Sequence, residues 1–494
     1  MAESKKKGEK RGKAERKGEG ERDPEREARI DRLLKEVQEE VKKRLGPDAT
    51  FEERSDAGFE IMKQVLNRRD GQDLREQVTQ EAEVEVGGKR YRRLKQSSSA
   101  TYYGPWGSHR VSEALYREIG VRNGPTIKPV ELRVGMIAGH MTPNLARIAG
   151  ELSGGCSSRE LIATMRAVGM SPPSRAFLER RVKRMGDEMA EQIEELEEVV
   201  RQTTPLPQGV ASVSCGLDRF SVRMSESPQE DTEARPVHRS EPYERTPPAP
   251  QEHHYRKAWV GTATVYDNEG TELHTWRYSV EADADAKALA DRVAADVAKV
   301  IQEHPQIPVH CIQDGAPELR ALPEALARAL PHSVKVRELV DFEHLVKDYL
   351  DHVVDACEPE GDPTQLKGRY RELLLSDDLA IDDIWSDLKD RQNKRPPHDR
   401  PAHEAISAAL SYIDKRKHKM RYASHYDDGL PIGSGATEGT CFAMQRRVQR
   451  PGQSWKTIGL RGTLTLRALV LSDRWTPAWR PYAAAHRKVV QCAN

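Results

Sequence analysis

The order of apolar stretches between residues 213 and 340 constrains the fold of this chain more than any other feature. Alternating or continuous apolar stretches predict strands, and longer stretches with apolar residues every three or four positions predict helices. Strands are expected over residues 213–224, 256–266, 271–280, 309–312 and 333–340, with helices over residues 283–303 and 318–330. Three antiparallel strands followed by helix-flanked parallel ones predict an α/β fold with a mixed sheet covered on both faces.

The remaining segments differ from this block in composition and pattern. Residues 1–28 are rich in Lys, Glu and Gly, and residues 226–254 are rich in Pro, Glu and Arg, which are compositions typical of disorder. Residues 29–80 have a helical pattern, which predicts either a helix docked on the body or a short dimerising coiled coil. The other expected divisions are an N-terminal region over 81–204, the first part of the core over 205–344, a helical insertion over 345–428, the last core helices over 429–480 and a tail over 481–494.

Composition excludes some classes of protein. Lys plus Arg and Asp plus Glu both number 79 among the 494 residues, so the net charge gives no information about partners. The sequence has no apolar run of about 18 residues, so no membrane span is expected. Residues 1–20 lack the apolar stretch of a secretory signal. The six cysteines include no Cys-x-x-Cys pair, which argues against a zinc site and fits the reducing cytoplasm.

Three acidic residues occupy positions where such a fold can carry chemistry. Asp218 interrupts the first strand, although Asp is disfavoured in strand interiors. Asp314 follows the fourth strand, and Glu438 follows a Gly-Ser-Gly turn. Two carboxylates from adjacent strands and a third from a nearby helix can hold two Mg²⁺ or Mn²⁺ ions for phosphoryl transfer. Each acid also has an ordinary alternative, as a cross-strand partner of an arginine, a turn residue or a first-turn helix acid, respectively.

Basic and aromatic residues after Glu438 predict contacts with nucleic acid. The glycines before Glu438 permit close approach of the backbone to a phosphate. Candidates for phosphate contacts on the following helix are Arg446, Arg447 and Arg450. A solvated basic face is the alternative interpretation of these arginines. Trp455 is a candidate for stacking on a splayed base, with a core tryptophan as the alternative.

Residues 81–204 are expected to form a mainly helical N-terminal region with a β-hairpin near its start. Two helices within residues 157–185 flank a short glycine connector, and Ser171-Pro172 is a good start for the second helix. This arrangement is similar to a helix-turn-helix DNA reader, in which Arg175 and Arg180 would contact DNA. An ordinary helical hairpin is the alternative.

Several blocks of sequence carry a family resemblance. The core blocks are "GLDRFSV", "IQDGAPEL", "DFEHLVKDYL", "GLPIGSGATEGTC" and "RRVQRPGQSWKTIGLRGTLTLRALVLSDRW", and the upstream blocks are "GGKRYRRL", "YYGPWGSHRVSEALYRE" and "SSRELIATMRAVGMSPPSRAFLERRV". They resemble bacterial insertion-sequence transposases of the Kra group, which are DDE enzymes related to the Mutator-like superfamily. The resemblance implies that Asp218, Asp314 and Glu438 are the catalytic and metal-binding acids of a ribonuclease-H-like core, whose element order this chain also has. Asp341 and His344 match a family (C/D)-x-x-H block, either as supports of the active site or as a structural hydrogen bond.

The expected function is therefore DNA transposition. The N-terminal region would recognise terminal inverted repeats, and the core would cut the element ends and join them to target DNA with two Mg²⁺ or Mn²⁺ ions. The protein is expected to act as a homodimer or larger assembly on DNA, in the bacterial cytoplasm with the nucleoid. The alternatives are a nuclease on the same core that does not join strands, and a domesticated DNA-binding protein without catalysis. A coiled-coil interaction protein is a weaker alternative, because it leaves the acid-bearing strands unexplained.

Overall fold

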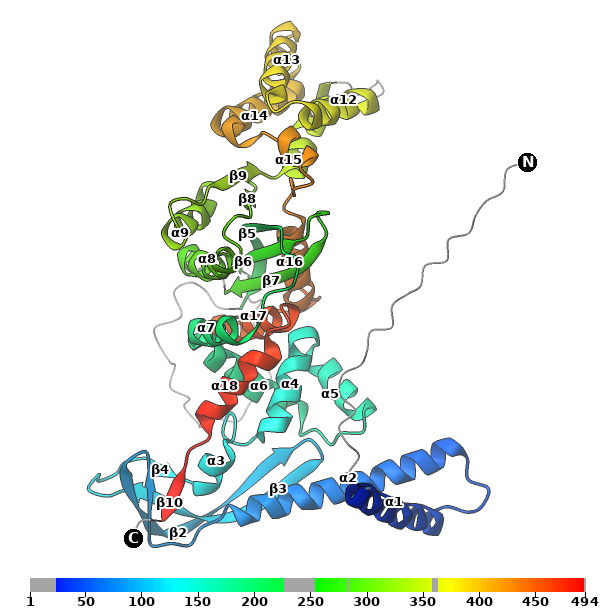
Figure 1. Ribbon diagram of the computed structural model, residues 1–494, viewed down its shortest axis with the longest axis vertical. Coiled ribbons are helices and arrows are strands. Elements are labelled where there is room, and N and C mark those ends of the chain that lie inside the picture. The colour runs from blue at the N-terminus through cyan, green and yellow to red at the C-terminus, as the bar shows by residue number, and fades with distance from the viewer. Residues whose placement is uncertain (1–23, 226–253, 282–283, 358–362, 493–494) are drawn as a thin grey trace, which may run out of the picture.

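The computed structural model describes residues 24–225, 254–281, 284–357 and 363–492 (Figure 1). It is a mixed α/β protein with two five-stranded sheets. The segments predicted to be disordered, 1–28 and 226–254, lie almost entirely outside the described residues. Helix α1 (Pro24–Arg44) begins inside the first of these segments, earlier than predicted. None of the described helices combines the length and the apolar character needed to cross a membrane.

The central sheet contains the predicted strands. They are β5 (Ser212–Met224), β6 (His254–Tyr266), β7 (Glu272–Val280), β8 (Val309–Gln313) and β9 (Val336–Val340). Their order in space is β7-β6-β5-β8-β9. The sheet is mixed, as predicted, because β6 is antiparallel to β5 and β7, whereas β8 is parallel to β5 and β9. Strand β9 begins later than residue 333, since the Val334 N–H closes a turn by donating to the carbonyl of Pro331 at 2.9 Å.

Helices cover both faces of this sheet. Helices α8 (Ala286–Glu303) and α9 (Ala321–Ala329) lie on one face, with η2 (Pro317–Arg320) before α9. Helices α16 (Gly435–Val448) and α17 (Thr457–Leu471) lie on the other. Side chains of a strand alternate between the two faces. In β5, Leu217 packs with α8, whereas Phe220 packs with α16 and α17. Asp218 therefore points to the α16 face.

Helices form beyond β9, where an insertion was predicted (Figure 1, yellow to orange). They are α10 (Phe342–Leu345), η3 (Val346–Leu350), α11 (Asp351–Cys357), α12 (Pro363–Ser376), α13 (Ala380–Lys394), α14 (Arg400–Arg416), η4 (Lys417–Lys419) and α15 (Ala423–Asp427). These helices bury a core of their own, which continues into the sheet through Ile312 and Leu339. The insertion is thus anchored at the carboxyl ends of β8 and β9.

A buried histidine pair joins the insertion to the sheet. His310 of β8 and His425 of α15 have ring centroids 5.3 Å apart, and none of their ring nitrogens has a hydrogen-bond partner in the described structure. Burial, followed by the charges of His425 and Arg337, lowers the pKa of His310 to about 3. Burial also lowers the pKa of His425. Both imidazoles are therefore neutral in the folded protein near neutral pH.

We expect this pair to make the protein sensitive to acid. The pKa of His310 is lower in the folded than in the unfolded protein, so its contribution to stability is intact above about pH 6.5 and is lost as the pH falls towards 3. By about pH 5 the loss from His310 alone is about 2 kcal/mol. Urea unfolding at several pH values measures it. The acid-induced loss of stability should be smaller in His310→Gln and unchanged in the exposed control His398→Gln. Equal acid sensitivity of the native protein and His310→Gln would contradict this account.

The N-terminal part of the chain contributes a second sheet. Helix α2 (Phe51–Glu76) leads into β1 (Glu83–Val86), β2 (Lys89–Gly104), β3 (Gly107–Glu118) and β4 (Thr126–Ile127), and α3 (Pro129–Val134) follows. The sheet order is β10-β1-β2-β3-β4. The predicted tail over 481–494 is wrong in part: α18 (Trp475–His486) continues to residue 486, and β10 (Val490–Cys492) pairs antiparallel with β1. The C-terminal segment completes this sheet because β1 offers it an open edge.

One hydrophobic core joins the N-terminal helices to the last helices of the chain. The participating elements are α4 (Pro143–Gly155), α5 (Ser158–Ala167), α6 (Arg175–Glu191), α7 (Ile193–Thr203), α17 and α18. Helices α6 and α17 cross at Gly186 and Gly462, where a Cβ added to Gly186 would lie 2.6 Å from the carbonyl oxygen of Gly462. The predicted boundary near Thr204 is a turn in the chain, but it does not separate two bodies, because the helices on its two sides share this core.

Candidate functional site

Asp218 lies near the middle of β5, under α16. One carboxylate oxygen accepts a hydrogen bond from the Cys441 thiol at 3.1 Å, and the other accepts from the backbone N–H of Arg219 at 2.6 Å. Burial raises the pKa of Asp218; the two hydrogen bonds oppose this shift, and the charge of Asp314 adds to it. Asp218 thus lies close enough to a second carboxylate to respond to its charge.

Asp314 immediately follows β8, the parallel neighbour of β5. Cys215 and Cys311 are aligned in the two strands, so Asp218 and Asp314, each three residues further on, reach the same region of the sheet. The Asp314 carboxylate accepts from the Ala316 N–H at 2.7 Å, and its carbonyl accepts from the Tyr412 hydroxyl at 2.6 Å. The structure therefore brings the first two predicted acids together and fixes the second against the helical insertion.

Glu438 belongs to the first turn of α16, which is docked on the sheet by its neighbour in sequence. The Thr437 hydroxyl lies 2.6 Å from the Thr262 hydroxyl. A Cβ added to Gly216 would lie 2.7 Å from the same Thr437 hydroxyl. Only glycine at position 216 permits this approach. The Glu438 carboxylate is exposed and accepts from the Ser434 hydroxyl at 3.2 Å. It lies one helical turn before Cys441, which contacts Asp218.

The three acids are not arranged as a ready metal centre. Within the described residues, no group of three or more His, Cys, Asp or Glu side chains is placed to hold an ion. The oxygen donors nevertheless suit a hard divalent cation. Nearby cations are engaged elsewhere, since Arg219 pairs with Glu318 and Lys347 pairs with Glu343, each at 2.9 Å. Burial and the charge of Asp314 raise the pKa of Asp218, and the charge of Arg219 opposes this shift. A bound cation would stabilise the ionised carboxylate further.

Asp341 has a structural role at the junction of three segments. It is 1% exposed, and it accepts hydrogen bonds from the backbone N–H groups of His344, at 2.6 Å, and Ser434. It thereby ties the end of β9 and the start of the insertion to the turn before α16. The His344 ring does not bond to Asp341: its Nδ1 lies 2.7 Å from Asp348, and it packs against Tyr412, which holds Asp314.

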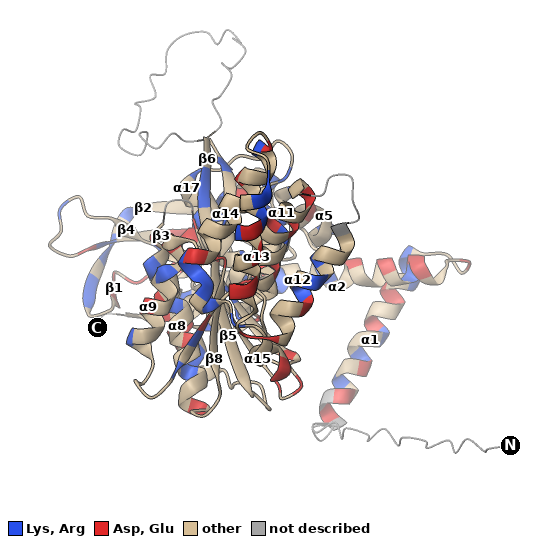
Figure 2. Ribbon diagram, turned by 90° about the horizontal axis from the view of Figure 1, so that it is seen from above, with Lys and Arg blue, Asp and Glu red and all other residues tan. Residues whose placement is uncertain are grey.

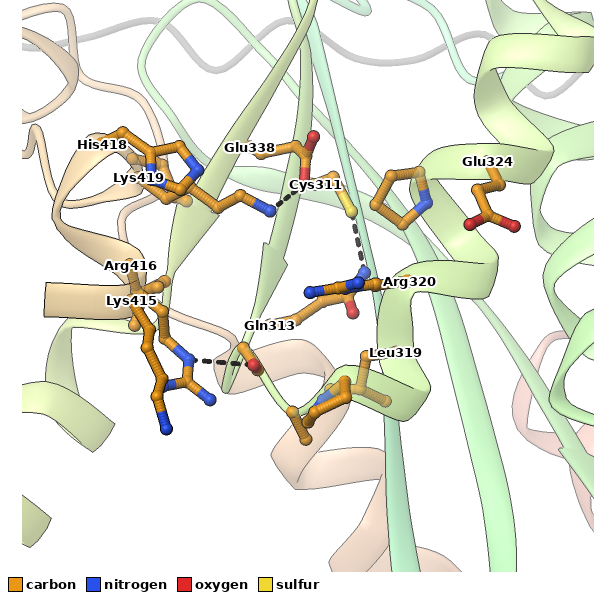
Figure 3. Close-up of a pocket in the computed structure, with 16 residues that line it drawn as sticks. Cys311, Gln313, Leu319, Arg320, Glu324, Glu338, Lys415, Arg416, His418 and Lys419 are labelled. Carbon is orange, nitrogen blue, oxygen red and sulfur yellow. Dashed lines mark hydrogen bonds and ion pairs between the residues drawn. The ribbon is translucent and has the colours of Figure 1, made fainter. Parts of the chain in front are cut away.

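A basic cavity of about 560 Å³ is lined by Gln313 and Gly315, the neighbours of Asp314 in sequence (Figure 3). Its basic side chains are Arg320, Lys415, Arg416, His418 and Lys419. Arg416 donates to the carbonyl of Gly315 at 2.9 Å, and Lys419 pairs with Glu338 at 2.5 Å. Arg320 stands on the opposite wall from the residues of the insertion. The cavity therefore brings positive charge from two elements to the segment that carries the second acid, together with the acids Glu324 and Glu338.

Two predicted nucleic-acid contacts are largely buried, and for Trp455, which lies in a hydrophobic core, the prediction is wrong. Trp455 is 5% exposed, and its indole N–H donates to the carbonyl of Val448 at 2.8 Å. Arg447 is 8% exposed and donates to the carbonyl of Ser153 at 3.0 Å. Of the other two predicted arginines, Arg446 is exposed and Arg450 pairs with Glu160 at 2.6 Å. The alternative of a core tryptophan is thus the correct one.

The predicted helical hairpin over 157–185 corresponds to α5 and α6, with one correction. Helix α6 begins at Arg175 after Ser174, whose hydroxyl accepts from the N–H of Phe177 at 3.3 Å. The predicted start at Ser171-Pro172 is wrong because Pro173 follows Pro172, and a proline disfavours the helical conformation of the residue before it. Arg175 and Arg180 are exposed, so both remain available for an external partner.

Sequence reasoning missed Cys441, Thr437 and Tyr412. Cys441 follows Glu438 by three residues, which places it one turn further along α16, and this spacing was a usable signal. The contacts of Thr437 and Tyr412 join segments far apart in sequence, and no local pattern indicates them. Comparison with known proteins gives no further guidance, since neither a family model nor a curated protein matches this chain.

Proposed function

We propose that this protein is a DDE-type DNA transposase that cuts element ends and joins them to target DNA. The observation that carries the proposal is that Asp314, directly after β8, lies close enough to Asp218 of the parallel strand β5 for its charge to raise the pKa of Asp218, with the helix of Glu438 docked over β5. The strand order β7-β6-β5-β8-β9, with β6 antiparallel to its neighbours, supports a ribonuclease-H-like core. The helical insertion after β9 supports the same assignment.

Asp218 and Asp314 would hold Mg²⁺ or Mn²⁺ between them, and Glu438 would contribute to a second ion after leaving the Ser434 hydroxyl. Two such ions stabilise the attacking and leaving oxygens of an in-line displacement at phosphorus. The protein supplies the positions of the acids. Tyr412 holds the backbone of Asp314, and Asp341 holds the turn before α16. Arg320 and Lys415 would attract DNA phosphates towards Asp314.

Exposed residues of α6 and α1 indicate the remaining partners, which are the element ends and a second copy of the chain. Exposed Arg175 and Arg180 of α6 would contact the terminal inverted repeats. Helix α1 leaves Ile30, Leu33 and Leu34 between 47% and 60% exposed, which supports pairing of this helix with another copy of the chain. We therefore propose a homodimer or larger assembly on DNA, associated with the bacterial nucleoid.

A strand-cleavage and strand-transfer assay tests the function. The substrate is DNA flanking the gene, incubated with the native protein and Mg²⁺ or Mn²⁺. Cleavage followed by joining is the expected result. Cleavage without joining identifies the nuclease alternative, and binding without either step identifies the domesticated DNA-binding protein. A protein that neither binds nor cuts this DNA is not a transposase acting on these ends.

Cys441 should affect how the rate of cleavage falls at acid pH. Its thiol donates to Asp218 and so opposes the effect of burial on the pKa of that carboxyl. In Cys441→Ala the pKa of Asp218 rises, and the acid limb of the pH–rate profile for cleavage moves up by about one unit. Cys441→Ser retains a donor and should leave the profile near that of the native protein. Identical profiles for Cys441→Ala and the native protein would exclude this role.

A further inference from the structure

A second basic hollow, of about 540 Å³, lies beside the C-terminal half of α16. Its side chains include Arg446, Arg447, Arg450 and, from α17, Arg467. Among the described residues, no acidic side chain lines it. We call this site the four-arginine hollow. It is distinct from the cavity near Asp314, which is lined by β8, β9, η2, α9 and the helical insertion.

The four arginines are crowded and only partly neutralised. Arg450 reaches Glu160 outside the lining at 2.6 Å, whereas Arg447 and Arg467 donate to the backbone carbonyls of Ser153 and Gly154, at 3.0 and 3.2 Å. The Nε of Arg467 is buried without a hydrogen-bond partner. Burial, followed by the charges of neighbouring arginines, lowers the pKa of Arg447 to about 10. Crowded guanidinium groups of this kind favour an anion among them.

An exposed aromatic ring stands at the edge of the hollow. Phe442 is 60% exposed, and the guanidinium of Arg446 lies 5.6 Å from its ring centroid. Glu438, Phe442 and Arg446 are spaced four residues apart, so they form one outward stripe on α16. The stripe runs about 12 Å along the helix, from the third predicted acid to the arginines. The opposite face of α16, with Cys441 and Met444, is packed against the sheet.

We propose that the Phe442 stripe and the four-arginine hollow form a track for a single nucleic-acid strand. One base would stack on Phe442, and the phosphates beyond it would enter the hollow. Arginine binds phosphate through several donors in fixed geometry, and an exposed aromatic ring accepts any base. The inference rests on the proposed function, because it names the path of a strand held at the acids. It gives Phe442 the stacking role that buried Trp455 cannot fill.

Equilibrium binding tests the track without chemistry. Fluorescein-labelled single-stranded DNA of about 20 nucleotides, and the matching blunt duplex, are titrated in EDTA and followed by fluorescence anisotropy. We expect Phe442→Ala to weaken single-strand binding about five- to 100-fold, with smaller loss for the duplex. Phe442→Trp should restore it. Arg446→Gln should reduce the slope of log K against log salt by about 0.7 for the single strand.

Matched controls separate the track from general effects of exposed residues. Tyr426→Ala removes an aromatic ring that is 56% exposed on another helix, and Arg328→Gln removes an exposed arginine paired with Asp291. Both should bind DNA like the native protein. Equal binding by Phe442→Ala and the native protein overturns the track, even where the native protein cleaves DNA. A native protein that cleaves nothing but loses single-strand affinity on Phe442→Ala keeps the track and loses the proposed enzyme.

Discussion

Asp314→Asn should abolish cleavage and strand transfer while leaving the protein folded. Asparagine has nearly the same shape, and its carbonyl oxygen can still accept from the Ala316 N–H, so the turn after β8 is retained. The change removes the negative charge that a divalent cation requires. Loss of several kcal/mol of transition-state stabilisation corresponds to a rate reduction of about 10³-fold or more. Single-turnover cleavage of end-labelled DNA in Mg²⁺ measures this reduction.

The same Asp314→Asn variant should also change the pKa of Asp218. The charge of Asp314 is one of the causes that raise the pKa of Asp218, so the pKa of Asp218 should fall when this charge is removed. Asp267→Asn is the matched control, because Asp267 also accepts backbone N–H bonds in a turn, from Glu269 and Thr271 at 2.9 and 2.8 Å. It should cut DNA at the native rate. A folded Asp314→Asn protein that cleaves at the native rate would remove Asp314 from the active site.

The central sheet could be predicted because its pattern is local. Alternation of apolar residues locates each strand, and the parallel pairing of β5 with β8 then brings Asp218 and Asp314 together. The orientation of Glu438 could not be predicted, because it depends on the Ser434 hydroxyl one turn away and on the approach of Thr437 to Gly216. Sequence indicates that an acid is present at the start of a helix, but not the rotamer it adopts.

The burial of some predicted nucleic-acid contacts has a different origin. Arg446 and Arg447 are adjacent in sequence, yet only the first is exposed, because Met444 and Val448 set the buried face of α16. Assigning the buried face of the helix from these apolar residues would have placed Arg447 near that face and Arg446 away from it. Strand β10 and the shared core of α6 and α17 depend on contacts between distant parts of the chain, which local patterns do not encode.

The largest stability effect should come from Asp296 of α8, which joins several elements through one buried carboxylate. Asp296 is 2% exposed, and it accepts hydrogen bonds from the Tyr278 hydroxyl and from the guanidinium of Arg474. Arg201 of α7 lies 3.3 Å away. Asp296→Ala leaves Arg474 buried with this partner removed. Breaking a buried ion pair from one side typically costs about 3–5 kcal/mol, and urea unfolding measures this loss.

The burial of the carboxylate, rather than its presence on α8, should determine the loss of stability. Asp291 lies on the same helix and pairs with Arg328 at 2.6 Å, but both side chains are about half exposed. Asp291→Ala should therefore cost less than about 1 kcal/mol. Because Arg474 lies 5.5 Å from the Trp276 ring, tryptophan fluorescence should change early in unfolding of Asp296→Ala. If both variants lose the same stability, the buried network does not hold α7, α8 and β7 together, and the apolar core beneath them does.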